Sequence, residues 1–185
     1  MTDSQRLTPL APIVKVVTVK APPERAFARF TREIARWWPL RSHSVGEADA
    51  ESVTMEERVG GRIVERTRSG AEFVWGTIDT WEPPHRVAFS WHPGDDPARA
   101  THVELQFTAD GTRTRVELRH SGFERLGPKG SRIRRAYPIG WAYVLGLYAE
   151  RRGPFIVGIK ALTAALMALR AWRERRAGKA SHGVA

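Results

Sequence analysis

The chain has 185 residues, of which 42% are hydrophobic, and it contains no cysteine. A chain of this length can bury one good core, and the lack of cysteine excludes disulfides, thiolate nucleophiles and cysteine-ligated metals. The formal charge of +10 is uneven, because residues 125–185 hold 13 basic and 2 acidic groups. Arginine outnumbers lysine 25 to 5, which fits a compositional bias better than a nucleic-acid interface, so we expect no nucleic-acid partner.

The chain begins with a polar, proline-containing segment, residues 1–11, for which we expect a mobile lead-in. This segment lacks the apolar core of a secretory signal, which predicts a cytoplasmic protein. The β-branched run Ile13–Val19 then predicts the first strand. Pro22 and Pro23 end this strand and suit the first turn of a helix.

Apolar residues at spacings of three and four over residues 25–38 predict two short helices or one bent helix, which Pro39 ends. The following segment, Leu40–Ala50, contains His43, Gly46 and two acidic residues. We expect a loop there that is long enough to form the rim or lid of a site.

From Glu51 the pattern changes to short alternating runs that are separated by turn residues. Six strands are predicted, over Ser52–Val59, Arg62–Arg68, Phe73–Trp81, Arg86–His92, Val103–Phe107 and Arg113–His120. The pair Gly60-Gly61 predicts a tight hairpin between the first two strands, because both positions tolerate positive φ.

The segment Tyr137–Arg152 carries an apolar stripe with three aromatic rings, which is typical of a helix that lies on a sheet. The order of one strand, short helices, six strands and a long helix predicts an α+β fold. In this fold an antiparallel sheet of about seven strands wraps the last helix. Such a helix either fills the concave side of the sheet or leaves a cavity beneath it.

A second apolar run follows the break at Gly153-Pro154. Five apolar side chains of this run fall within one narrow arc and predict an extra amphipathic helix over Pro154–Arg176. Only about 15 residues are mostly apolar, against the ~20 that a membrane span requires, so we expect no span. The apolar face could pack on the domain, pair with its copy in a homodimer, or lie on an anionic membrane, and we favour the first two.

Four motifs resemble the activator-of-Hsp-ninety-ATPase-homologue branch of the START-like, helix-grip superfamily, which also contains polyketide cyclases and the birch-pollen allergen family. They are Ala21–Phe27 (APPERAF), Trp37-Trp38-Pro39, Trp81–Trp91 (WEPPHRVAFSW) and Gly140-Trp141. The resemblance covers residues 12–152, so we expect one helix-grip domain there, followed by residues 153–185 as the amphipathic helix and a basic tail. It implies a deep hydrophobic cavity between the sheet and the last long helix, used for apolar or aromatic ligands.

Two titratable residues are candidates for inward polar groups on the predicted strands. His120 shares strand parity with Val116 and Leu118, so a neutral imidazole could bind a ligand or act as a base there. A core histidine satisfied by the backbone or a hydroxyl group is the more common outcome. Glu57 shares parity with Met55, although an exposed edge carboxylate is its alternative.

No metal or cofactor is expected from the sequence. The six histidines never stand at ligand spacing on one element. Nucleophile-elbow, Walker, dinucleotide-binding and zinc-protease motifs do not occur in the sequence.

The aromatic residues are dense enough to line a ligand pocket. The candidate ligand contacts are Trp38, Glu57, Val74, Trp75, Phe89, Trp91, Leu118, His120, Trp141 and Leu145. The sequence therefore predicts binding of a small hydrophobic or aromatic ligand under the last long helix. The alternatives are a cyclase- or hydratase-type enzyme that uses His120 or Glu57 on a polyketide-like substrate, and a chaperone-linked interaction module.

Overall fold

The computed structural model describes residues 8–150 and residue 158. The predicted helix Pro154–Arg176 lies outside these residues, apart from Gly158, which is helical and exposed. Its pairing in a homodimer therefore stays a prediction. In the part of the chain that the structure describes, no helix is long and apolar enough to cross a membrane.

Residues 8–150 fold into one antiparallel sheet with helices, as the predicted α+β class requires. The strands are β1 (Ile13–Val19), β2 (Ala50–Met55), β3 (Arg62–Thr67), β4 (Glu72–Glu82), β5 (Arg86–Trp91), β6 (Thr101–Asp110) and β7 (Arg113–Ser121), in the order β1-β7-β6-β5-β4-β3-β2. The helices are α1 (Pro23–Phe30), α2 (Ile34–Trp37) and α3 (Gly130–Tyr148), with the 3-10 helices η1 (Glu47–Asp49), η2 (Pro97–Arg99) and η3 (Phe123–Lys129). The predicted helix-grip arrangement is confirmed.

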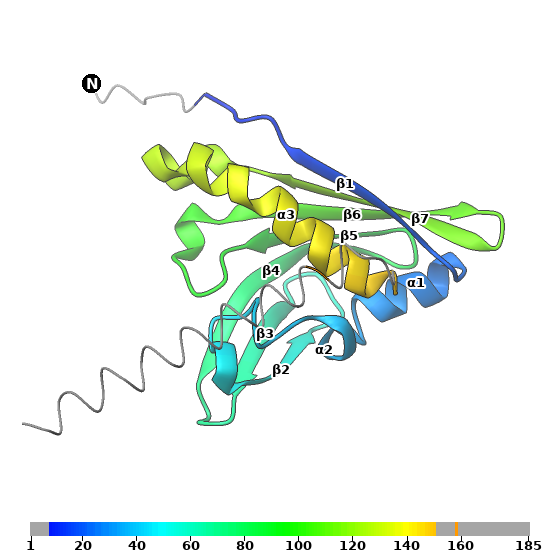
Figure 1. Cartoon of the computed structure of the whole chain (residues 1–185), viewed down its shortest axis with the longest axis horizontal. Coiled ribbons are helices and arrows are strands. Elements are labelled where there is room, and N and C mark those ends of the chain that lie inside the picture. Colours follow the sequence, from blue (N-terminus) through cyan, green and yellow to red (C-terminus); the bar gives the residue numbers. More distant parts are fainter. Residues whose placement is uncertain (1–7, 151–157, 159–185) are drawn as a thin grey trace, which may run out of the picture. The chain divides into compact units, whose positions relative to one another are not determined.

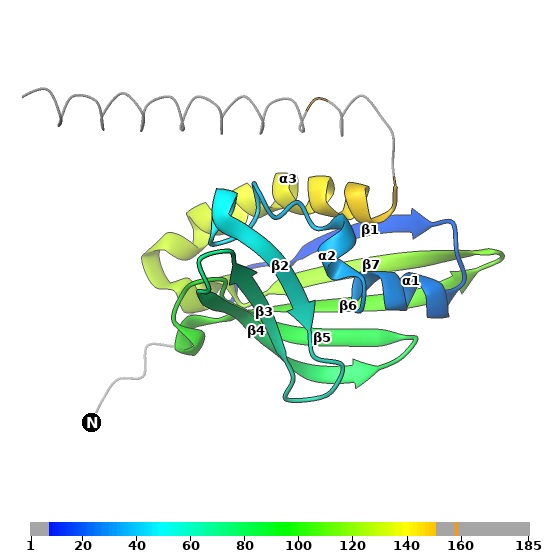
Figure 2. The same ribbon diagram turned by 90° about the horizontal axis from the view of Figure 1, so that it is seen from below.

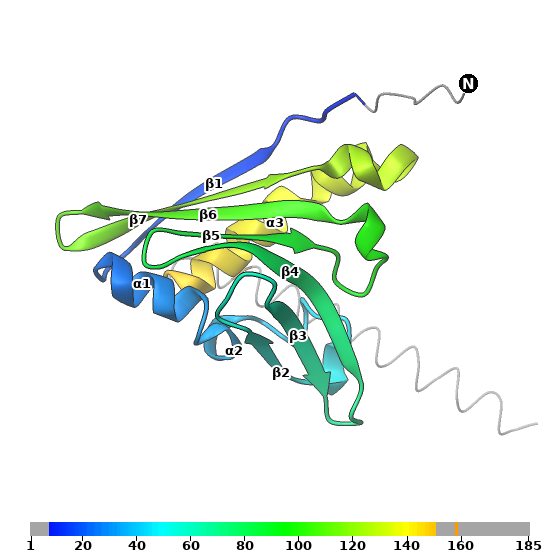
Figure 3. The ribbon, with the colours of Figure 1, turned by 180° about the vertical axis from the view of Figure 1, so that it is seen from behind.

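The long helix α3 lies across one face of the curved sheet (Figures 1 and 2). Seen from the opposite side, the strands lie in front of it (Figure 3). Strand alternation creates the face that receives the helix. In β7, for example, Val116, Leu118 and His120 are buried, whereas Arg115 and Arg119 are exposed.

Several predicted boundaries differ from the structure, and two of the differences bear on the site. Strand β2 ends at Met55 rather than at Val59, because the chain turns there: the Glu56 carboxylate accepts the Arg62 backbone N–H at 3.0 Å. The connection to β3 is therefore longer than the predicted two-residue hairpin.

Helix α3 begins at Gly130 rather than at Tyr137. Residues 130–136 are mostly polar and carry no apolar stripe, so the periodic pattern begins only where the helix meets the cavity. Pro138 consequently lies inside the helix instead of in its first turn.

Aromatic side chains fill the space beneath the carboxyl-terminal half of α3. The Phe30 ring lies 5.3 Å from Tyr148 and 6.2 Å from Phe107, measured between centroids. The Tyr148 hydroxyl donates to the Ala26 carbonyl oxygen at 2.7 Å and joins α3 to α1. This end of the space between helix and sheet is therefore solid core.

Candidate ligand-binding site

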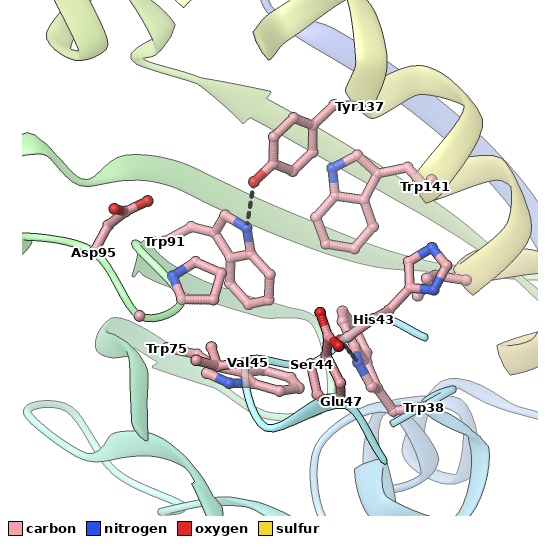
Figure 4. Close-up of a pocket in the computed structure, with 14 residues that line it drawn as sticks. Trp38, His43, Ser44, Val45, Glu47, Trp75, Trp91, Asp95, Tyr137 and Trp141 are labelled. Atoms are coloured by element: carbon pink, nitrogen blue, oxygen red, sulfur yellow. Dashed lines mark hydrogen bonds between the residues drawn. The ribbon is translucent and has the colours of Figure 1, made fainter. Parts of the chain in front are cut away.

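A cavity of about 500 Å³ lies beneath the middle of α3 (Figure 4). Small-molecule sites in proteins commonly have volumes of about 300–1,000 Å³. Its walls are Trp38, His43, Ser44, Val45, Glu47, Trp75, Trp91, Pro93, Gly94, Asp95, Tyr137, Gly140, Trp141 and Val144. The sheet, α3, the loop after α2 and the loop after β5 thus all contribute to one pocket.

Four tryptophans from separate elements pack against one another and together line one part of the cavity, and we call this cluster the tryptophan box. Trp38 follows α2, Trp75 is in β4, Trp91 is in β5 and Trp141 is in α3. Neighbouring ring centroids are 5.1, 5.7, 5.8 and 6.2 Å apart, and the centroids of Trp38 and Trp91, on opposite sides of the group, are also only 5.8 Å apart. These separations are those of aromatic rings in contact.

Each indole N–H of the tryptophan box donates a hydrogen bond inside the protein. Trp38 donates to the His43 carbonyl oxygen at 2.7 Å, and Trp75 donates to Glu65 Oε2 at 2.7 Å. Trp91 donates to the Tyr137 hydroxyl at 3.1 Å, and Trp141 donates to His120 Nδ1 at 2.9 Å. The four indoles therefore offer a ligand aromatic carbon surface and no unpaired donor.

A buried carboxylate, Glu65 of β3, positions one wall and the loop above it. Its side chain is 0% exposed. Besides Trp75, it accepts the backbone N–H groups of Val45 at 2.8 Å and Gly46 at 2.7 Å. A Cβ atom at Gly46 would lie 2.6 Å from the Thr67 side chain, so this close approach requires glycine.

The polar groups of the pocket come from the loops and from the start of the α3 stripe. Glu47 and Asp95 supply carboxylates, and Tyr137 supplies a hydroxyl group. Burial raises the pKa of Tyr137, which keeps its phenol protonated at neutral pH. Because its oxygen accepts the Trp91 N–H, the Tyr137 hydroxyl proton is left to donate elsewhere.

His120 lies behind the Trp141 wall rather than in the pocket lining. The Trp141 indole can only donate, so His120 Nδ1 accepts and its Nε2 carries the proton. Nε2 then donates to Thr101 Oγ1 at 2.8 Å, and that hydroxyl donates to the Trp91 carbonyl oxygen at 2.9 Å. Both ring nitrogens are occupied, which is the arrangement of a structural core histidine that links two walls of the tryptophan box.

We expect His120 to remain neutral throughout the physiological pH range. It is 0% exposed, and burial, with a smaller effect of His102, lowers its pKa to about 3. The unfolded chain binds a proton near the ordinary pKa of about 6.5 and the folded chain does not, so stability should fall as pH drops from about 6.5 toward 3. The His120 ring signal, assigned in NMR spectra with a His120→Gln variant, should not shift between pH 8 and 5. A titrating signal would show that the ring is open to solvent.

Glu57 does not face the cavity, and the prediction that it points inward is wrong. Because β2 ends at Met55, strand parity no longer applies to it. Its side chain is 39% exposed and accepts both Nε and Nη2 of Arg32, at 2.8 and 2.7 Å. The Arg32 guanidinium lowers the pKa of Glu57, so the carboxylate stays ionised in a surface ion pair.

Other predicted contacts lie in the protein but outside the lining. Phe89, Leu118 and Leu145 are fully buried core side chains. Val74 is half-buried and pairs with Val64 across β3 and β4, whereas its neighbour Trp75 lines the cavity. Adjacent strand residues point to opposite faces, so only one of them can contact a ligand there.

The loop residues that line the cavity, such as Val45 and Gly94, were not among the contacts predicted from the sequence. Val45 and Gly94 meet where the two loops approach, with only 3.0 Å between the Val45 side chain and the place of a Cβ at residue 94. The Leu40–Ala50 segment was expected to form a rim, but its individual side chains could not be chosen. Among residues 8–150, no three histidine, aspartate or glutamate side chains gather closely enough to hold a metal ion.

Comparisons with known proteins agree with this architecture. The sequence model of the family described as activator of Hsp90 ATPase homolog 1-like protein matches residues 20–143. Among solved structures, an anthrahydroquino-gamma-pyrone synthase, Txn09, is 34% identical with a TM-score of 0.55, covering 77% of this chain and 97% of that one. No curated protein matches this chain.

Two further structures extend the comparison. CalC from Micromonospora echinospora, described as a self-sacrificing resistance protein, is 25% identical with a TM-score of 0.55, covering 76% of this chain and 93% of that one. The Aha1 dimer from Colwellia psychrerythraea is 14% identical with a TM-score of 0.53, covering 78% of this chain and 100% of that one. At that identity, the second likeness shows the fold alone.

Proposed function

Because this chain belongs to the activator of Hsp90 ATPase homolog 1-like family, we propose that its helix-grip cavity binds a flat, polycyclic aromatic ligand. The observation that carries the proposal is the tryptophan box, whose four indole N–H groups are all bonded within the protein. A ligand in this pocket meets aromatic walls that favour stacking over hydrogen bonding. The Tyr137 hydroxyl and the two carboxylates add a few polar contacts, as in most small-molecule sites.

The 34% identical relative supports a fused-ring ligand, because its name describes an anthrahydroquino-gamma-pyrone synthase. That protein and this chain match over most of both lengths. The synthase activity belongs to that relative. The ligand class proposed for this chain rests on the shape and chemistry of the cavity in this chain.

Filling the cavity from Gly140 tests the proposal without removing any wall. A Cβ at Gly140 meets no atom within 4 Å, although the residue lines the cavity. Glycine in a helix interior is itself unfavourable by about 0.5–1 kcal/mol relative to alanine. Gly140→Phe should therefore fold normally and weaken binding of 9-anthracenemethanol at least about tenfold, or 1.4 kcal/mol. Saturable quenching of tryptophan emission by the probe measures this affinity.

The neighbouring residue supplies the matched control. Ile139 is 65% exposed, so Ile139→Phe adds the same ring to the same helix outside the cavity. It should leave the probe affinity unchanged. Equal affinities of the two variants would show that the probe does not occupy the cavity.

A cyclase- or synthase-type enzyme is the second candidate, and the synthase relative is the observation that favours it. His120 and Glu57 cannot be its acid and base, since the first is buried with both nitrogens bonded and the second pairs with Arg32. Tyr137 could instead donate its hydroxyl proton to a carbonyl oxygen of a polyketide-like substrate. Mass spectrometry of a bound polyketide would distinguish the roles, because an enzyme changes its mass or structure and a binding protein releases it unaltered.

A further inference from the structure

We propose that Val45 and Gly94 form a clasp that closes one end of the cavity and limits the size of the ring system that it accepts. This inference rests on the proposed function and adds the residues that select ligands by size. It follows from a close contact between two loops and from the way in which both loops are anchored to Trp75.

The clasp joins the loop after α2, which carries Val45, to the loop after β5, which carries Gly94. Both residues line the cavity. A Cβ at Gly94 would lie 3.0 and 3.1 Å from the two γ-carbons of Val45 and 3.7 Å from its Cβ. Carbon atoms in favourable contact are about 3.5–4.0 Å apart, so the Val45 methyl groups already fill the space beside Gly94. The two loops therefore meet without a gap at this end of the cavity.

The first loop is anchored to the Trp75 side chain through Glu65. Glu65 Oε2 accepts the Trp75 indole N–H at 2.7 Å and the Val45 backbone N–H at 2.8 Å, and Oε1 accepts the Gly46 N–H at 2.7 Å. One fully buried carboxylate thus holds two successive N–H groups and fixes the place from which the Val45 side chain projects. In Figure 4, Val45 lies beside Trp75, away from Trp141 of α3.

The second loop is anchored to the backbone of the same tryptophan. The Trp75 carbonyl oxygen accepts the His92 N–H at 2.7 Å, and the His92 carbonyl oxygen accepts the Asp95 N–H at 2.9 Å. His92 Nδ1 lies 3.2 Å from the Asp95 carbonyl oxygen, and the histidine is buried. The turn that carries Gly94 is therefore closed on itself and attached to β4.

The cavity is tight at the clasp and open at α3. A Cβ at Gly140 of α3 would meet no atom within 4 Å, whereas a Cβ at Gly94 would meet Val45 at 3.0 Å. A ligand can therefore occupy the free space beneath α3, but a larger ring system has to push Val45 aside. That movement would break hydrogen bonds to Glu65 or distort the turn at Gly94, and a buried donor left without an acceptor is costly. Large ring systems are excluded for this reason.

Two probes that differ by one fused ring test this selection. They are 9-anthracenemethanol, with three rings, and 1-pyrenemethanol, with four. Val45→Ala removes two methyl groups from the clasp of the full-length protein and should raise the ratio of four-ring to three-ring affinity at least about threefold. Val59→Ala is the matched control, because Val59 is 61% exposed and lies outside the lining, and it should leave the ratio unchanged. Saturable quenching of tryptophan emission measures both affinities.

Substitutions at Gly94 locate the size limit at the contact itself. Gly94→Ala places a methyl group against the Val45 γ-carbons and should force the loops apart, which also raises the ratio. In the double variant with Val45→Ala, the new methyl group would face only the Cβ of residue 45, at 3.7 Å, and should bring the ratio back toward that of the unmodified protein. Gly111→Ala is the control for backbone strain, since Gly111 has a φ of +58° against +72° at Gly94 and its Cβ would meet no atom within 4 Å.

The outcomes separate the two proposals. An unchanged ratio in Val45→Ala would overturn the clasp while leaving aromatic binding intact, and this variant adds no atom, so the test holds even if Gly94→Ala does not fold. Additive effects of the two substitutions in the double variant would also overturn it. Failure of both probes to quench tryptophan emission would instead overturn the proposed aromatic-binding function.

Discussion

Replacing Glu65 with alanine is expected to lower the free energy of unfolding by about 4 kcal/mol. The carboxylate is fully buried and accepts three hydrogen bonds, from Val45 N, Gly46 N and the Trp75 indole. Alanine would leave these three donors without their acceptor in a space closed to water. A buried donor that is left without an acceptor costs about 1–3 kcal/mol, so leaving three of them unpaired is among the largest effects a single substitution can have here.

Urea unfolding of the two proteins measures this difference. Glu72→Ala is the matched control, since Glu72 is an exposed glutamate of the adjacent strand whose partner is Arg66 at 2.7 Å. A surface ion pair of this kind contributes only about 0–1 kcal/mol. Similar losses in both variants would show that Glu65 does not hold the loop and Trp75 in place.

Glu65 also shows why part of the site could not be predicted from the sequence. It shares strand parity with Ile63 and Thr67, both buried, so its inward orientation could have been inferred. Its partners lie 10, 19 and 20 residues away in the chain. No short-range pattern indicates that a loop and an indole meet on one carboxylate, because that meeting depends on how the strands are placed.

The fold was predictable because its periodicities are strong. Alternation in β7 and the aromatic stripe of α3 identify the two faces that pack together. The ends of helices and strands were predicted less accurately where the chain is polar. Strand β2 ends early, at the turn that begins with Glu56, and α3 starts before its apolar stripe. The first of these errors placed Glu57 on the wrong face.

The tryptophans of the site could be predicted from residue type alone, since large rings on inward positions meet in the middle of a small domain. Trp38, Trp75, Trp91 and Trp141 all line the cavity. The mouth could not be predicted in the same way. Glu47 and Asp95 lie in loops without periodicity, and only the three-dimensional structure brings the two loops together.

Substitutions of Trp141 distinguish how much its ring packing and how much its hydrogen bond to His120 contribute to stability. Its side chain is 3% exposed and contacts the rings of Trp38 and Trp91. Trp141→Ala is expected to lower the free energy of unfolding by about 3–5 kcal/mol, because it leaves a cavity and removes the donor to His120 Nδ1. It should also weaken the uptake of a hydrophobic fluorophore.

Trp141→Phe keeps an aromatic wall but cannot donate to His120, so it should cost about 1–3 kcal/mol, mainly the penalty of an unpaired buried acceptor. Ile139→Ala, at the exposed neighbouring position on α3, should change stability by less than about 0.5 kcal/mol. Urea unfolding and fluorophore titration of the three variants measure both properties. If Trp141→Ala were as stable as the Ile139 variant, the ring would be exposed and α3 would not cover the cavity. If the alanine and phenylalanine variants lost the same stability, the hydrogen bond to His120, rather than ring packing, would be what holds α3 against the sheet at this point.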